Sequence, residues 1–372
     1  MKKVSNKRVL FLIPSVGSGG IETYLLRFLE ARSSEIEATI VVRSNHPGDL
    51  FNDFDALRIP MRFLPFGYFN PYRWVEYFIY FKKGAFSTIC DFNANFGGLI
   101  MLLARIAKIS NRIAFYRQGS NHFRSTFLKR VYNYLMNRLI YRNSTYILAN
   151  SIAGLDYFFP YRKLSDQRFK VVYNGVDVSK ISVKIDKEKI LEELSIPKGS
   201  FIVGHVGRVD KSKNHKTIFK VVSSIIKNNP QVILVLCGTG TDAFHDKINE
   251  LGLHNNTRLL GYRSDVYAIM QVFDLFYFPS ITEGQPNALL EAMALGIPII
   301  ASDIKPIREI MPEDSLLFDP FNTANVVEII CDIVKNKQSY VFDHLTVYVS
   351  EKFNIERNYS AFLEIINNNE AC

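Results

Sequence analysis

Short apolar runs alternate with amphipathic stretches along most of this 372-residue chain. The runs RVLFLIPSV (8–16) and ATIVVR (38–43) are nearly continuous in apolar residues, so they predict buried strands. Ile21–Ala31 and Gly98–Ile109 repeat apolar residues at the spacing of one helix face. Further strands are predicted at 112–118 and 145–151. This alternation is typical of an α/β domain with a parallel sheet.

The same alternation starts again near residue 200. Strands are predicted at 201–208, 231–238, 257–262, 275–280 and 298–302, and helices at 217–227, 242–251, 266–270 and 286–295. An Asn174-Gly175 turn and the charged segment 184–200 separate the two series. We therefore predict an α/β protein with two doubly wound, Rossmann-like domains, 1–178 and 179–350. A C-terminal segment, 351–372, is helical over Glu351–Asn367 and is expected to pack back on the first domain.

A glycine-rich turn follows the first predicted strand. Gly17, Gly19 and Gly20 precede a helix, and parallel α/β sheets bind ligands beyond the carboxyl ends of their strands. A helix N-terminus offers N–H groups and partial positive charge to a phosphate. The spacing is not G-x-G-x-x-G, and no acid closes the second strand to hold an NAD ribose. A tight turn without a ligand remains the alternative.

Two cations follow the first strand of the second half, in GHVGRVDKSKNH (204–215). Arg208 presents a planar fork of donors and Lys213 a point charge, and such a pair can flank a diphosphate. The alternative is a solvated basic loop.

Two glutamates lie in PSITEGQPNALLEAMALGIPIIAS (279–302). Pro286 is expected at the first helical position, which places Glu283 on the preceding loop and Glu291 more than one turn inside the helix. A carboxylate inside an apolar helix needs a partner, because burying it unpaired is costly. Ribose hydroxyls could be that partner; a structural salt bridge is the alternative.

In combination, these motifs resemble the GT-B-fold retaining glycosyltransferases of family 4 (glycosyl transferases group 1), like those of bacterial surface-polysaccharide biosynthesis. The resemblance covers nearly the whole chain and includes Gly19-Gly20, Arg208 with Lys213, and Glu283 seven residues before Glu291. It implies a GT-B architecture, with an acceptor-side first domain facing a nucleotide-sugar donor domain across a cleft.

The resemblance also assigns roles. Arg208 and Lys213 would hold the donor diphosphate and stabilise it as the leaving group, Glu283 would bind the transferred sugar, and Glu291 the ribose. The implied catalytic residues are Glu283, Arg208 and Lys213. The implied donor-binding set is Gly19, Gly20, Arg208, Lys213, Tyr262, Arg263, Glu283, Gly284, Gln285, Asn287 and Glu291.

The expected reaction is metal-independent hexosyl transfer with anomeric retention. The donor would be a nucleotide sugar, a UDP-sugar by expectation, and the acceptor a saccharide or polyprenyl-linked saccharide. Neither a cofactor nor a metal is expected, since the four cysteines are far apart and the Asp53-Phe54-Asp55 triplet is not at a strand end.

One departure from the family concerns the acceptor side. Many relatives carry a histidine after the strand that here precedes RQGSNHF. The aligned position is Arg117, and His122 follows five residues later. Either is a candidate for the acceptor pocket.

The net charge of +9 is unevenly placed, with +14 in residues 1–180 and −5 in 181–372. No nucleic-acid-binding signature is present, so an anionic membrane surface is the expected partner of the basic half. The alternative is a basic surface that serves solubility alone. The segments 72–83 and 124–142 combine aromatic residues and cations at helical spacing, as interfacial helices do. The alternative is that their aromatic residues are core. No run of ~18 apolar residues predicts a membrane span, so a cytoplasmic location, at the inner face of the cell membrane, is expected.

Two alternatives belong to other functional classes. A nucleotide-sugar epimerase of the same fold would need no acceptor. A non-catalytic glycosyltransferase-like subunit is conceivable because the acceptor-side histidine is replaced, but it would have no reason to keep four converging charges.

Overall fold

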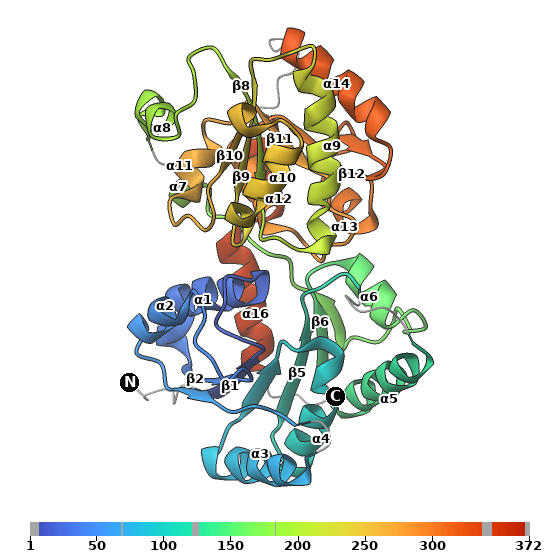
Figure 1. Ribbon diagram of the computed structural model, residues 1–372. Coiled ribbons are helices and arrows are strands. Elements are labelled where there is room, and N and C mark those ends of the chain that lie inside the picture. Colours follow the sequence, from blue (N-terminus) through green and yellow to red (C-terminus); the bar gives the residue numbers. More distant parts are fainter. Residues whose placement is uncertain (1–6, 68–69, 121–125, 183, 337–343, 369–372) are drawn as a thin grey trace. The chain divides into compact units, whose positions relative to one another are not determined.

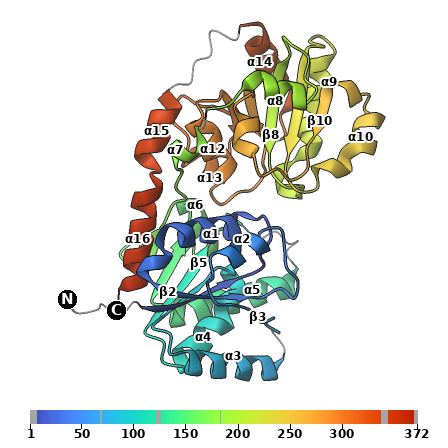
Figure 2. The ribbon, with the colours of Figure 1, turned by 90° about the vertical axis from the view of Figure 1, so that its left-hand side faces the viewer.

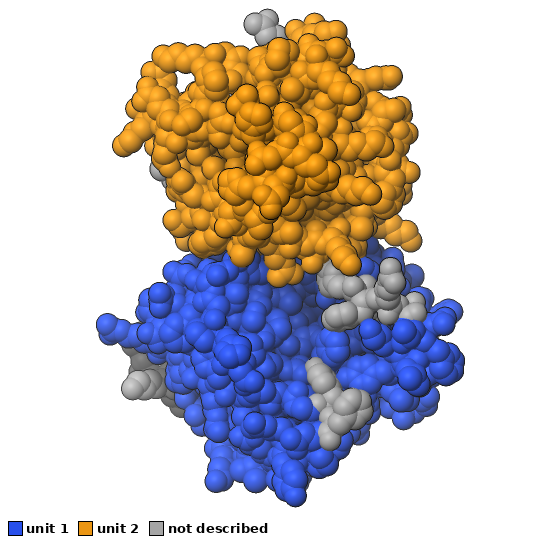
Figure 3. Space-filling view, in the orientation of Figure 1, with its two compact units in different colours: residues 1–174, 356–372 blue, residues 175–355 orange. Residues whose placement is uncertain are grey.

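The computed structural model describes residues 7–67, 70–120, 126–182, 184–336 and 344–368. The chain divides into two compact units, shown in different colours in Figure 3. Unit 1 comprises residues 1–174 and 356–372, and unit 2 comprises residues 175–355. The predicted domain limits, after 178 and after 350, lie within five residues of these divisions.

Unit 1 contains a seven-stranded parallel sheet with the order β3-β2-β1-β4-β5-β6-β7 (Figure 1). Its strands are β1 (Arg8–Ile13), β2 (Glu37–Val42), β3 (Met61–Phe63), β4 (Thr88–Asp91), β5 (Asn111–Tyr116), β6 (Tyr146–Ala149) and β7 (Phe169–Val171). β1 is fully buried beyond its first residue, as expected of a strand covered on both faces.

Helices cover both faces of this sheet. They are α1 (Gly20–Arg32), α2 (Phe51–Ala56), α3 (Pro71–Gly84), α4 (Gly98–Ile106), α5 (Phe127–Asn143), α6 (Ile152–Phe158) and α16 (Ile355–Asn367), with short 3-10 turns at Ser33–Glu35 and Ala94–Gly97. Successive strand residues alternate between the faces. Leu10 and Leu12 thus join the core under α3, α4 and α5, whereas Phe11 packs against Phe28 of α1.

The C-terminal helix α16 lies against α1 within unit 1 (Figure 2). The Phe28 and Phe362 rings lie 4.9 Å apart, centroid to centroid. The side chains of Thr88 and Asn111 donate hydrogen bonds to carbonyls at the end of α16, the former to Ile366 at 2.9 Å. These bonds satisfy carbonyl groups that a helix C-terminus leaves without intrahelical partners.

The expected single helix over Glu351–Asn367 is wrong in one respect. α15 (His344–Lys352) ends at Lys352, and α16 begins at Ile355. At this break the N–H of Val176 donates to the carbonyl of Phe353 at 2.9 Å, and Asn354 pairs with Val176 in a β-bridge. The backbone at Phe353 and Asn354 is therefore used for pairing with another segment of the chain and leaves the helix.

Unit 2 contains a six-stranded parallel sheet with the order β10-β9-β8-β11-β12-β13. Its strands are β8 (Phe201–Val206), β9 (Val232–Cys237), β10 (Thr257–Leu259), β11 (Leu275–Phe278), β12 (Ile299–Ser302) and β13 (Leu316–Phe318). Its helices are α7 (Val178–Ile181), α8 (Lys187–Glu193), α9 (His215–Ile226), α10 (His245–Glu250), α11 (Val266–Met270), α12 (Asn287–Ala294), α13 (Lys305–Arg308), α14 (Thr323–Lys335) and α15, with 3-10 turns at Lys211–Lys213, Thr241–Phe244 and His254–Asn256.

The predicted fold class is confirmed, because both units have parallel sheets with helices on their faces. All strands predicted in the sequence are present, usually ending one to three residues earlier than predicted. The short strands β3, β4, β7 and β13 were not predicted. β4 matters most, because it is a central strand of unit 1.

Candidate active site

The sheet of unit 2 changes its winding direction between β8 and β11. From β8 the chain adds β9 and β10 on one side, and then returns to add β11, β12 and β13 on the other. The loops that leave the carboxyl ends of β8 and β11 therefore diverge, which opens the crevice where doubly wound sheets bind ligands. Arg208 and Lys213 lie on the first loop, and Glu283 lies on the second.

These two loops are joined by hydrogen bonds. The N–H of Ile281 donates to the carbonyl of Ser212 at 2.8 Å. Asn214, in a left-handed conformation, donates from its side-chain amide to the carbonyl of Pro279 at 3.2 Å. Asp210 accepts from the N–H of Ser212 at 2.8 Å and so caps the short turn that carries Lys213. The position of Lys213 relative to the second loop is therefore set by backbone as well as side-chain bonds.

Lys213 and Glu283 form an ion pair across the crevice. The distance between Lys213 Nζ and Glu283 Oε1 is 2.6 Å, and the two side chains are only 16% and 12% exposed. The same ammonium lies 4.8 Å from the centroid of the Phe278 ring. Since a phosphate oxygen can replace a carboxylate as the partner of an ammonium, an anionic ligand would compete with Glu283 for Lys213.

Arg208 differs from Lys213 in being exposed, and among the described residues no hydrogen-bond or ion-pair partner holds its guanidinium. It follows Gly207, and close packing of two loops fixes the backbone here. A Cβ on Gly238, whose φ is +143°, would lie 2.3 Å from the carbonyl oxygen of Gly207. Only glycine fits both this conformation and this approach.

The helix that follows Glu283 begins one residue later than predicted. α12 starts at Asn287, and Pro286 occupies the N-cap position with φ −75° and ψ 117°. The prediction placed Pro286 at the first helical position. Gly284 and Gln285 are buried beside this N-terminus, and Asn287 is half-buried. The N-terminus of α12 thus lies at the carboxyl edge of the sheet, in the segment that follows Glu283.

Glu291 is buried on the second turn of α12. Its Oε1 atom accepts a hydrogen bond from the hydroxyl of Tyr267 at 3.1 Å. Tyr267 belongs to α11 and did not appear among the predicted site residues. Its signal in the sequence was weak, because a single tyrosine in a short amphipathic helix is usually core.

The loop after β10 carries Tyr262 and Arg263. Tyr262 is exposed. Arg263 donates to both carboxylate oxygens of Asp265, at 2.7 Å each, and to Glu193 at 2.6 Å. These hydrogen bonds raise the pKa of Arg263 and lower that of Asp265. The Arg263 side chain is therefore committed to holding its own loop, which leaves the backbone of this segment as the part available to a ligand.

Two buried histidines lie beneath the Lys213 loop. Their rings are 5.3 Å apart, and Nδ1 of His205 donates to the carbonyl of Tyr277 at 2.9 Å. Burial, then His215 and Lys213, lowers the pKa of His205 to about 3. Burial and Lys213 lower the pKa of His215 to about 4. Both imidazoles are consequently neutral at physiological pH, and the fixed positive charge of the site comes from Arg208 and Lys213.

The glycine-rich turn of unit 1 follows β1, at the point where that sheet also changes its winding direction, between β1 and β4. α1 begins at Gly20, after Gly19 at the N-cap. Glu22, buried in the first turn, accepts from the Ser15 hydroxyl at 2.6 Å. A carboxylate in this position is stabilised by the partial positive charge of the helix N-terminus.

Arg117 lies directly after β5 and is buried. Its guanidinium carbon is 3.5 Å from the centroid of the Tyr24 ring, and Nη2 donates to Oδ1 of Asn174. Burial lowers the pKa of Arg117 to about 10. The predicted acceptor-side residue is therefore packed into unit 1, whereas His122, the other candidate, lies outside the described residues.

β4 brings an unpredicted polar residue to the same edge. Asp91, at the end of β4, is buried, and its Oδ1 accepts from the N–H of Asn93 at 3.3 Å. Burial raises the pKa of Asp91. The run TICD is too short to be recognised as a central strand, so the sequence did not place Asp91 beside the end of β1, where it pairs with Leu12.

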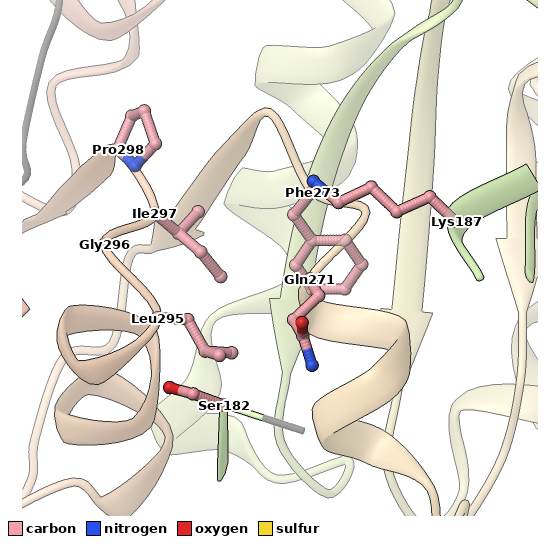
Figure 4. Close-up of a pocket in the computed structure, with 8 residues that line it drawn as sticks. All are labelled: Ser182, Lys187, Gln271, Phe273, Leu295, Gly296, Ile297 and Pro298. Carbon is pink, nitrogen blue, oxygen red and sulfur yellow. The ribbon is translucent and has the colours of Figure 1, made fainter. Parts of the chain in front are cut away.

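A pocket of about 370 Å³ lies at the other edge of the unit 2 sheet, where β11 and β12 begin (Figure 4). Leu295 and Ile297 line one side, and Gln271 and Phe273 the other. None of the predicted site residues contributes to it.

Within the described ranges, no three or more His, Cys, Asp or Glu side chains are grouped so that they could hold a metal ion. None of the helices in the part of the chain described here has the length and apolar character needed to cross a bilayer.

Comparison with known proteins gives matches to both units. Residues 186–341 match the family model "Glycosyl transferases group 1", and residues 18–180 match "Glycosyltransferase Family 4". The capsular polysaccharide biosynthesis glycosyltransferase CapH of Staphylococcus aureus is 25% identical over 82% of this chain and 83% of its own length. The UDP-Gal:alpha-D-GlcNAc-diphosphoundecaprenol alpha-1,3-galactosyltransferase of Escherichia coli is 34% identical over 37% of each chain.

Among solved structures, HepE of Anabaena in complex with UDP and glucose superposes with a TM-score of 0.81. The superposition covers 96% of this chain and 99% of that chain at 21% identity. Fold and matches together define the class: this is a glycosyltransferase of GT-B fold. Within that class the chain belongs to the group 1 glycosyltransferases, since the two family models account for residues 18–180 and 186–341.

Proposed function

We propose that this glycosyltransferase moves a hexose from a UDP-sugar to a saccharide or polyprenyl-linked saccharide in surface-polysaccharide biosynthesis, with retention of the anomeric configuration. The donor assignment draws on HepE, whose structure is named as a complex with UDP and glucose. The acceptor assignment draws on CapH and on the galactosyltransferase, whose names specify capsular polysaccharide and a diphosphoundecaprenol-linked acceptor.

The observation that carries the proposal is the Lys213–Glu283 ion pair at the winding switch of the unit 2 sheet. In the proposed donor complex, the diphosphate takes the place of Glu283 on Lys213, and Arg208 binds the same group from the exposed side. The released Glu283 carboxylate then accepts hydrogen bonds from sugar hydroxyls, and Glu291, oriented by Tyr267, accepts from the ribose.

For the chemical step, we propose attack by the acceptor hydroxyl on the same face as the departing diphosphate. The bond between the anomeric carbon and the diphosphate oxygen breaks, the bond to the acceptor oxygen forms, and the leaving diphosphate accepts the hydroxyl proton. Arg208 and Lys213 stabilise the charge that develops on the leaving group. Since two side-chain cations neutralise the diphosphate, the mechanism requires no metal.

The E. coli relative is named as forming an alpha linkage from UDP-Gal. Galactose in UDP-Gal is α-linked to its diphosphate, so an α product retains the anomeric configuration, as proposed here. The relatives are named as transferases, which does not favour the alternatives of an epimerase or a non-catalytic subunit. We further propose that the enzyme works at the cytoplasmic face of the cell membrane, where polyprenyl-linked acceptors reside.

The proposal is tested by incubating the enzyme with a UDP-sugar and a lipid-diphosphate-linked saccharide in excess chelator. The expected result is transfer with release of UDP and an α-anomeric proton in the product's NMR spectrum. A β-linked product would contradict retention. Complete loss of transfer on chelation, restored by added manganese or magnesium, would contradict the metal-free site.

A further inference from the structure

The structure separates the two aromatic and basic segments of unit 1, which look alike in the sequence. In α3, Tyr77 and Phe81 are buried, and Trp74, Phe78 and Tyr80 pack against the core. The α3 acid Glu76 pairs with Arg73 at 2.6 Å and with Arg62 at 3.6 Å. The aromatic residues of α3 are therefore mostly core, and part of its charge is balanced within the fold.

α5 is different, because six of its large apolar residues are exposed, whereas α3 exposes only Tyr72, Val75 and Ile79. Phe127, Leu128 and Tyr134 are 72%, 78% and 62% exposed. Val131, Leu135 and Tyr141 are exposed as well. Steps of three and four residues relate Phe127, Val131, Tyr134, Arg138 and Tyr141, so they follow one stripe along the helix.

The charges of α5 have one sign. The helix contains Lys129, Arg130, Arg138 and Arg142, all exposed, and no aspartate or glutamate. Exposed cations are thus interleaved with exposed aromatic and aliphatic side chains on the same helix. This combination suits an anionic bilayer surface, where cations meet headgroups and apolar side chains enter the acyl boundary.

The inner face of α5 is fixed to unit 1. Met136 and Ile140 are buried, and the Tyr116 hydroxyl donates to Asn137 Oδ1 at 3.0 Å. α4 approaches so closely that a Cβ on Gly98 would lie 2.8 Å from the carbonyl oxygen of Met136. The outward stripe is therefore held on a rigid support and does not depend on a flexible segment to present it. Figure 1 shows α5 along the margin of unit 1, beside α4.

The exposed apolar surface of α5 continues onto the segment that follows α6, between Phe158 and Arg168. The α5 residue Asn137 donates to the carbonyl of Phe158 at 3.1 Å, and Arg168 donates to that of Tyr141 at 2.8 Å. Between these two contacts the chain exposes Tyr161 and Leu164 almost completely.

We propose that α5 is an interfacial helix through which unit 1 docks on an anionic lipid bilayer, and that α3 takes no comparable part. The proposal rests on the proposed function only in that a lipid-linked acceptor gives the docking a purpose. A second copy of the chain is a poorer occupant, because pairing two α5 faces would bring eight cations together without a compensating acid.

Charge-matched variants test the choice of helix. Lys129→Glu with Arg130→Glu reverses two adjacent cations on α5, and Lys82→Glu with Lys83→Glu does the same on α3, where both lysines are exposed. Cosedimentation uses vesicles of phosphatidylglycerol and phosphatidylcholine in equal parts, and of phosphatidylcholine alone. We expect the α5 pair to bind anionic vesicles about 30-fold more weakly than wild type, and the α3 pair within about threefold of it. High salt should weaken wild-type binding as the Debye length shrinks.

An apolar pair tests insertion apart from charge. Leu128→Ser with Leu135→Ser should weaken vesicle binding at least about tenfold, whereas Val75→Ser with Ile79→Ser on α3 should not. Circular dichroism confirms that each variant is folded, and calorimetry with UDP reports donor binding separately. UDP binding without vesicle binding in wild type would overturn the docking proposal alone. Vesicle binding without UDP binding would overturn the donor site alone. Equal losses in the α3 and α5 variants, or a wild-type dimer dissociated by the α5 apolar pair, would also overturn the assignment of α5.

Discussion

Each unit places a cation beyond the carboxyl end of a central strand, Lys213 after β8 and Arg117 after β5. Lys213 is partly exposed and pairs with the carboxylate of Glu283 at 2.6 Å. Arg117 is buried against the neutral ring of Tyr24 and the amide of Asn174. An anionic ligand can replace a carboxylate on Lys213, but it would have to open the core of unit 1 to reach Arg117. A cation at a sheet edge is thus within reach of an anionic ligand in one unit and part of the core packing in the other.

Among variants that test this difference between the two units, Glu283→Gln is expected to have the strongest effect. Glu283→Gln should lower the rate of transfer at least about 100-fold, because the carboxylate that accepts from the sugar hydroxyls is lost. The affinity for UDP should stay equal or rise, since Lys213 no longer has a competing carboxylate. Initial rates and calorimetry measure the two effects. A parallel loss of UDP affinity would contradict the proposed exchange of partners on Lys213.

Substitution of Glu291 should have the opposite effect, with the main loss in UDP affinity. Glu291→Gln is expected to weaken UDP binding about 10- to 100-fold, the range for a hydrogen bond to a charged group. Tyr267→Phe removes the hydroxyl that orients Glu291 and should cause a smaller loss of UDP affinity, about threefold to tenfold. Unchanged UDP affinity in Glu291→Gln would make this carboxylate a structural one.

Substitution of Arg117 is expected to affect the stability of unit 1 before it affects transfer. Arg117→Met should lower the free energy of unfolding of unit 1 by about 2 kcal/mol, because the contact with Tyr24 and the bond to Asn174 are both removed. The single tryptophan, Trp74, lies in unit 1 and reports its urea unfolding. The exposed Arg142→Met serves as the control. A stable Arg117→Met protein with abolished transfer would instead favour a direct role at the acceptor.

The smallest expected effect is a pH dependence from His205 and His215. Because their folded pKa values lie below the ordinary 6.5, the stability they contribute is complete above that pH and is lost as the pH falls toward 4. The free energy of unfolding should fall by about 1 kcal/mol between pH 7 and pH 6. His215→Gln should reduce this slope, whereas the exposed His254→Gln should not. If the free energy of unfolding depended on pH equally in both variants, the assignment of this pH dependence to His215 would be contradicted.

The fold could be predicted because its strands are nearly continuous apolar runs and its motifs follow them. The sequence also separated Glu283 from Glu291 by the helix start at Pro286, with an error of one residue. The short strand β4 could not be predicted, since four residues show no clear period. Asp91 was therefore missed, although it lies at the winding switch of unit 1.

Contacts between segments that are distant along the chain could not be predicted from the sequence either. The approach of Lys213 to Glu283 joins residues 70 positions apart, and the Tyr267–Glu291 bond joins two helices. Helical spacing could not distinguish α3 from α5 either. Both segments alternate aromatic residues with cations, and only the packing of α3 against the core shows which face is covered.

The most direct test of the account is calorimetric titration of UDP, in chelator, into wild type, Arg208→Ala and Lys213→Ala. Lys227→Ala is the control, an exposed lysine just beyond the end of α9, far along the helix from Lys213. Wild type and the control are expected to bind UDP in the presence of chelator. Each site variant should bind at least about 10-fold more weakly while keeping its thermal unfolding profile, since a charge-assisted hydrogen bond contributes about 1.5–3 kcal/mol. UDP affinity equal to wild type in both site variants would contradict the assignment of this edge of unit 2 to the donor diphosphate.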